Sequence, residues 1–151
     1  MNKLFLEAYI ESFSNFEIAM NGLTKSLEHC TRIGLKSNYA FEETEAFDAL
    51  IIKLTRNSDV FFQQLVKAFF KLKGEDNLMF IDRLHMLEKI GVVDNVDQLM
   101  VLKSFRNQVV HEYSAVAFQE LYQEALELTP FFIKTVQQFK VFLEKENILK
   151  S

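Results

Sequence analysis

Apolar side chains recur at steps of three and four residues along most of the chain, which is the spacing of one face of an α-helix. Over residues 2–33 this pattern is unbroken, and Gly34 follows it at a place where glycine commonly ends a helix. We therefore predict a long amphipathic helix over these residues. Its inward positions are Phe5, Ala8, Tyr9, Phe13, Phe16, Ala19, Met20, Leu23, Leu27 and Cys30.

A second run alternates steps of four and three residues and ends at Gly74. Ser58 is the one polar member of its seam, which consists of Phe47, Ile51, Leu54, Ser58, Phe61, Leu65, Ala68 and Leu72. The seam alone would also suit a coiled coil with another chain. A second stripe widens the apolar face and favours a helix inside a bundle. That stripe is Phe62, Val66, Phe69 and Phe70.

A shorter helical pattern carries apolar residues over 80–90 and stops at Gly91. Asp76 and Asn77 precede it, and both residue types accept hydrogen bonds from the free N–H groups of a first helical turn. We predict that one of them is the N-cap of this third helix.

Two further helices complete the pattern. Asn95, with Gln98 three residues later, resembles a capping box and predicts a fourth helix that runs to about Tyr113. Ser114 is the predicted cap of a fifth helix, in which Pro130 should cause a kink. The inward positions of the fifth helix are Phe118, Leu121, Tyr122, Ala125, Leu128, Phe132, Val136, Phe139 and Phe142.

No segment alternates apolar and polar residues as a half-buried strand would. One Pro and four Gly leave little turn chemistry, so the elements must be few and long. Sixteen Phe and no Trp predict a core filled with phenyl rings. The expected fold is a single all-α domain over residues 1–151. In it, four core helices form an antiparallel up-and-down bundle and a fifth helix packs alongside.

Charge and composition restrict where the protein works. The net charge of −4 argues against general attraction to nucleic acid or anionic lipid, so any polyanion would need a local patch of cations. The first residues have too short an apolar run for a secretory signal, and no stretch approaches the ~20 apolar residues of a membrane span. The single cysteine suits a reducing compartment. We expect a cytoplasmic protein that does not bind membranes.

The stretch SFRNQVVHEY, residues 104–113, places four polar or aromatic side chains in a helix otherwise built for packing. With about 100° of rotation per residue, its core-facing positions are Leu102, Phe105 and Val109. Arg106 and Tyr113 then lie close together near the edge of the core. Asn107 and His111 are one turn apart on a face directed away from the core, where they can form a hydrogen bond.

An arginine and a histidine on one polar face suit acid–base chemistry at a phosphodiester. The ordinary pKa of histidine lies near neutral, so it can move a proton, and a guanidinium can hold a phosphate with two hydrogen bonds. In RNA the 2′-OH is an internal nucleophile, so neither a metal nor a cofactor is required. The alternative is that Arg106 and His111 simply belong to a solvated helix face.

Other candidate sites have weaker support. His111 and Glu112 do not extend to the H-E-x-x-H pattern of zinc proteases, and no Cys and His spacing indicates a zinc site. Cys30 lies in the apolar stripe of the first helix, which favours a core thiol over a nucleophile. His85 is expected at the surface.

The residues RNQVVHEY resemble the R-x4-6-H signature of the HEPN superfamily. The match is to the longer R-N-x-x-x-H-x-Y form of its toxins that are paired with minimal nucleotidyltransferases. The order and spacing of the motif residues are also similar to those of nucleotidyltransferase substrate-binding subunits from the same group. In both, an all-helical chain of about this length carries the motif near the start of its last third.

The resemblance implies a metal-independent endoribonuclease that forms a homodimer, with two motifs lining one composite cleft. Arg106 and His111 would be the catalytic pair. Asn107 would orient or polarise the catalytic groups, and Tyr113 would shape the site. The cognate nucleotidyltransferase antitoxin would add AMP to Tyr113 and so block RNA.

The same resemblance leaves a second function open, namely a non-catalytic substrate-binding subunit of a minimal nucleotidyltransferase. Lys103 is the one basic residue that flanks the motif in the sequence. RNA binding would therefore need cations from other helices, for which Lys53, Arg56 and Lys67 are candidates.

Overall fold

A computed structural model of the chain describes residues 2–111 and 115–150, with the backbone alone at 111 and 115–117. Every regular element in these residues is helical, so the all-α prediction is confirmed. Among them, no helix combines the length and apolarity needed to cross a bilayer.

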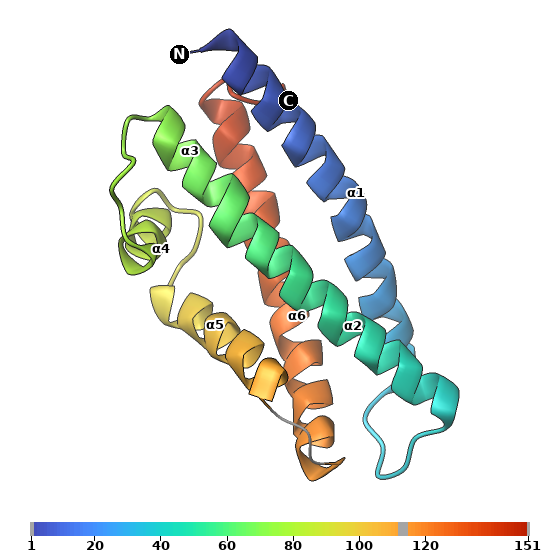
Figure 1. Cartoon of the computed structure of the whole chain (residues 1–151). Coiled ribbons are helices and arrows are strands. Elements are labelled where there is room, and N and C mark those ends of the chain that lie inside the picture. The colour runs from blue at the N-terminus through green and yellow to red at the C-terminus, as the bar shows by residue number, and fades with distance from the viewer. Residues whose placement is uncertain (1, 112–114, 151) are drawn as a thin grey trace.

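Three long helical rods lie side by side and form the body of the molecule (Figure 1). The first is α1 and the last is α6, and between them runs a rod made of three consecutive segments. Both chain ends lie at the same end of these rods (Figure 1). The bounds are α1 Lys3–Ile33, α2 Phe41–Val60, η1 Phe61–Val66, α3 Lys67–Leu72 and α6 Ala115–Lys145.

Two shorter helices, α4 (Phe80–Lys89) and α5 (Val96–His111), flank the long rods on one side (Figure 1). They contact each other, and α5 also contacts α6. The buried side chains of α5 are Leu99, Leu102 and Phe105, which anchor it to the core. This anchoring fixes which face of α5 points outward.

The core is dominated by phenyl rings, as sixteen Phe predicted. Phe61 is fully buried at its centre, with ring centroids 5.3 Å from Phe139, 5.7 Å from Phe132 and 6.0 Å from Phe16. Its contacts with Phe132 and Phe139 are edge-to-face, the arrangement that aromatic quadrupoles favour. The three long rods therefore meet at this one side chain.

The middle rod contains a π-helical turn over Phe61–Val66, where the sequence predicted a regular α-helix. Phe61, Phe62, Leu65 and Val66 are all buried, and Gln63 and Gln64 are exposed. The wider turn lets both apolar stripes predicted for this rod reach the core. The hydroxyl of Tyr9 donates a 3.0 Å hydrogen bond to the carbonyl of Leu65, which ties the π turn to α1.

The helix ends follow the sequence signals in most places. Asn2 caps α1, and the side chain of Asn95 accepts from the N–H of Asp97 at the start of α5. The prediction for α4 was wrong, since its N-cap is Met79 and neither Asp76 nor Asn77. The apolar Leu78 and Phe80 pack against the core and pull the chain inward, so the helix begins later than the capping signal indicated.

The α6 helix continues through Pro130, and the kink there stays a prediction. The buried hydroxyl of Thr129, the residue before the proline, donates to the carbonyl of Ala125 at 2.6 Å. The predicted cap of this helix, Ser114, lies outside the described residues.

Cys30 is a core thiol, as predicted, and its Sγ lies 3.3 Å from the carbonyl of Ala46. Burial raises the pKa of this thiol to about 11, and the Lys53 ammonium partly offsets the shift. We expect Ellman's reagent at pH 8 to label the denatured chain at once and the native chain only slowly. Fast labelling of the native chain would contradict this burial.

The same pKa shift makes the fold sensitive to alkali. Between pH 9 and 11 the unfolded thiol releases its proton while the folded one keeps it, so the unfolded state gains stability as the pH rises. The free energy of unfolding should therefore fall across this range, and it should fall less steeply in a Cys30→Ala variant. Equilibrium urea titrations at several pH values measure the slope.

Candidate active site

The described part of the motif on α5 follows the predicted helical spacing. Leu102 and Phe105 are buried, whereas Arg106 and Asn107 are exposed on the outer face. The helix ends at His111, so Arg106 and His111 stand five residues apart on its last turns. The side chain of His111 and the whole of Tyr113 lie outside the described residues.

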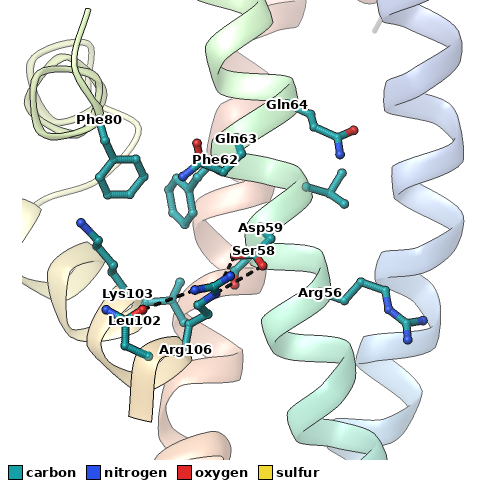
Figure 2. A pocket seen from close by; sticks show the side chains of 12 residues that line it. Arg56, Ser58, Asp59, Phe62, Gln63, Gln64, Phe80, Leu102, Lys103 and Arg106 are labelled. Carbon is teal, nitrogen blue, oxygen red and sulfur yellow. Dashed lines mark hydrogen bonds and ion pairs between the residues drawn. The ribbon is translucent and has the colours of Figure 1, made fainter. Parts of the chain in front are cut away.

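Arg106 points across to the middle rod and pairs with Asp59 (Figure 2). Its Nε lies 3.4 Å from each carboxylate oxygen, and Nη1 lies 3.4 Å from Oδ1 of Asn107. The two paired side chains are 46 % and 49 % exposed. An ion pair this long and this exposed contributes about 0–1 kcal/mol, so a ligand phosphate can compete for the guanidinium.

A cleft of about 430 Å³ opens beside Arg106 between three elements of the chain. The middle rod, the start of α4 and the outer edge of α5 supply its walls. The lining residues are Arg56, Ser58, Asp59, Val60, Phe62, Gln63, Gln64, Phe80, Leu102, Lys103, Arg106 and Asn107. The size suits one small ligand or one nucleotide unit of a polymer.

Phe80 forms the α4 side of the cleft and contacts two cations. Nζ of Lys103 lies 4.6 Å from the ring centroid, and the guanidinium carbon of Arg83 lies 5.7 Å from it. Arg83 is buried, which lowers its pKa, and it donates a 2.8 Å hydrogen bond to the carbonyl of Leu78. Arg83 thus fixes the start of α4, and Lys103 remains at the open side of the cleft.

Of the three cations named from the sequence as additional RNA contacts, Arg56 lines the cleft. Its guanidinium extends toward α1, away from Arg106 (Figure 2). Lys53 donates a 2.7 Å hydrogen bond to the hydroxyl of Ser26 on α1 and belongs to a different surface. Lys67 is exposed on α3 and does not line the cleft. Lys103 and Arg106 are therefore the cations that α5 itself contributes to the cleft.

Sequence reasoning missed Asp59 and Gln63. Both lie on the middle rod, and their distance from the motif along the chain hides their proximity in space. One signal was present, because Ser58 interrupts an otherwise apolar seam just before Asp59. Ser58 is buried, and its hydroxyl donates a 3.0 Å hydrogen bond to the carbonyl of Thr55. This polar residue therefore indicates where the cleft wall lies, while its own hydroxyl is already bonded within the helix.

In the part of the chain that the structure describes, His, Cys, Asp and Glu side chains do not gather in any group that could hold a metal ion. Comparisons of the chain with protein-family models, with curated proteins and with solved structures found no match.

Proposed function

We propose that this protein is an endoribonuclease of the HEPN type, the toxin of a toxin–antitoxin pair. The observation that carries the proposal is the position of Arg106, which lines a nucleotide-sized cleft and lies five residues before His111 on α5. The spacing of these two residues, with Asn107 and Tyr113, is the spacing of the family motif.

Each residue has a defined role in the proposed reaction. His111 takes the proton from the 2′-OH, whose oxygen attacks the adjoining phosphorus. The bond to the 5′-oxygen breaks, and that oxygen takes a proton from water, which leaves a 2′,3′-cyclic phosphate and a 5′-hydroxyl. Arg106 leaves Asp59, binds the phosphate and balances the charge that develops on its oxygens. Asn107, which contacts Arg106, holds the guanidinium at the helix surface. The nucleophile belongs to the RNA, so the reaction needs no metal or other cofactor.

The proposal includes a homodimer and a specific architecture. We assign α1, the α2–α3 rod, α5 and α6 to an antiparallel four-helix bundle, with α4 as the additional helix. A second copy would pack against the outer face of α5, where Val101 is half-exposed beside Ser104 and Asn107. Two motifs would then line one composite site in a cytoplasmic dimer.

Regulation follows from Tyr113. The cognate nucleotidyltransferase antitoxin would add AMP to its hydroxyl two residues after His111. The added phosphate brings a negative charge and the adenosine brings bulk, so the modified site would exclude RNA by repulsion and by sterics.

A second function, a non-catalytic substrate-binding subunit of a minimal nucleotidyltransferase, is favoured by one observation. The carboxylate of Asp59 lies against Arg106, so the cleft is less cationic than a polyanion site would be expected to be. This function predicts a stable complex with the nucleotidyltransferase and no cleavage by the isolated dimer.

The test uses the purified chain, after intact mass has shown that Tyr113 carries no AMP. Labelled RNA is incubated in EDTA with the parent chain and with a His111→Ala variant. Cleavage by the parent that is lost in the variant supports the ribonuclease. A folded, dimeric parent that leaves RNA intact excludes it in favour of the binding subunit.

A further inference from the structure

The cleft beside Arg106 has two chemically different sides. Along α5 it carries the cations Lys103 and Arg106, and along the middle rod it carries the Phe62 ring and the amide of Gln63. Phe80 closes the α4 end, with its ring centroid 6.1 Å from that of Phe62. Cations on one side, with rings and an amide opposite, match the phosphate and the base of one nucleotide.

We propose that this cleft is a nucleotide subsite that binds one base of single-stranded RNA next to the phosphate held by Arg106. In this subsite the base packs on the Phe62 and Phe80 rings, and Gln63 hydrogen-bonds its edge. Lys103 holds the neighbouring phosphate. The identity of the ligand as RNA rests on the proposed function, whereas the placement of the subsite rests on the cleft.

The rings of Phe62 and Phe80 explain why a base fits in the cleft. Phe62 is buried and so provides a fixed surface, and Phe80 is half-buried and lines the cleft opposite it (Figure 2). A base that packs on such rings gains affinity whatever its sequence. Nζ of Lys103 lies 4.6 Å from the centroid of the Phe80 ring, which places this cation beside the phosphate that joins that nucleotide to its neighbour.

Gln63 gives the subsite the means to distinguish bases. Its amide extends toward Phe80 from the π turn, and Gln64 points to the opposite side of the rod (Figure 2). Gln63 is exposed, and its side-chain amide forms no hydrogen bond with the side chain or backbone of another described residue. An amide can both donate to and accept from a base edge, which is the contact by which glutamine recognises adenine.

Asp59 sets how strongly the subsite binds. Its carboxylate forms an ion pair with the guanidinium of Arg106, and a bound phosphate would have to replace that carboxylate. An Asp59→Asn variant keeps the shape of this side chain and removes its charge. It should therefore bind RNA more tightly than the parent, by about threefold to tenfold at low salt.

The test measures binding separately from cleavage. Fluorescein-labelled 2′-O-methyl hexamers of A, C and U cannot be cut, because the attacking hydroxyl is blocked. Their dissociation constants are measured by anisotropy in EDTA for the parent and for Gln63→Ala, Lys103→Met and Asp59→Asn. Gln137→Ala and Lys134→Met, both at exposed positions on α6 that do not line the cleft, control for the lost amide and for the lost charge.

We expect Gln63→Ala to weaken binding of the preferred hexamer about tenfold and to reduce the difference among the three sequences. Lys103→Met should weaken all three hexamers by a similar factor, and both controls should bind like the parent. The subsite is wrong if Gln63→Ala behaves like Gln137→Ala while its circular dichroism matches the parent, or if the parent binds none of the hexamers.

The two proposals fail separately. A parent that cleaves RNA, with the Gln63 and Lys103 variants binding normally, would overturn the subsite and leave the ribonuclease intact. A parent that cleaves nothing but binds hexamers through Gln63 and Lys103 would support the subsite and overturn the ribonuclease.

Discussion

Replacing His111 with Ala is expected to lower the rate of RNA cleavage by about 10²–10⁴-fold, the range that general acid–base catalysis contributes. Single-turnover cleavage of a labelled RNA measures the effect. His85→Ala is the matched control, because His85 is exposed on α4 and does not line the cleft. A His111 variant that cleaves as fast as the His85 variant would remove this residue from the mechanism.

Arg106 provides a second measure of the same site. Arg106→Ala should lower the cleavage rate by about 10²–10³-fold, since it removes the group that stabilises charge on the phosphate. Arg106→Lys should recover only part of the loss, because an ammonium keeps the charge but lacks the planar pair of donors. Equal activity of the Lys variant and the parent would show that charge alone matters.

The largest expected effect on stability is at Phe61. Truncation to Ala removes a fully buried ring that contacts Phe16, Phe132 and Phe139, so α1, α6 and the π turn lose their common contact. We expect the free energy of unfolding to fall by about 4 kcal/mol and the melting temperature by roughly 10 °C. Urea titration followed by circular dichroism gives the first value and a thermal scan the second.

Phe41→Ala is the control for Phe61. It makes the same change to a ring that is 73 % exposed at the start of α2, and should cost less than about 0.5 kcal/mol. A loss below about 1 kcal/mol at Phe61 would mean that the π turn does not unite the three rods.

The helices could be predicted from the sequence because their information is local. The spacing of apolar residues located α1 to within one residue, and the two stripes of the middle rod are both buried or partly buried in the structure. The position of Arg106 near the edge of the core and the exposure of Asn107 also followed from their rotation relative to Leu102 and Phe105. A helix with several anchored residues fixes the orientation of the rest.

Features that depend on contacts between distant segments could not be predicted. The pairing of Arg106 with Asp59 joins residues 47 positions apart, and no local pattern shows which carboxylate meets which guanidinium. The π turn could not be predicted either, because its residues FFQQLV have an ordinary helical pattern. The start of α4 shifted because burial of Leu78 and Phe80 outweighed the capping preference of Asp76 and Asn77.

The chemical ends of the cleavage products test the central claim most directly. RNA cut in EDTA by the unmodified chain is analysed by mass spectrometry, beside the same RNA with one 2′-deoxynucleotide at the cleaved position. Attack by the 2′-OH predicts a 2′,3′-cyclic phosphate on one fragment, a 5′-hydroxyl on the other and no cutting at the deoxy position. Fragments with 5′-phosphate ends, or cutting at the deoxy position, would contradict the assignment of Arg106 and His111 to this reaction.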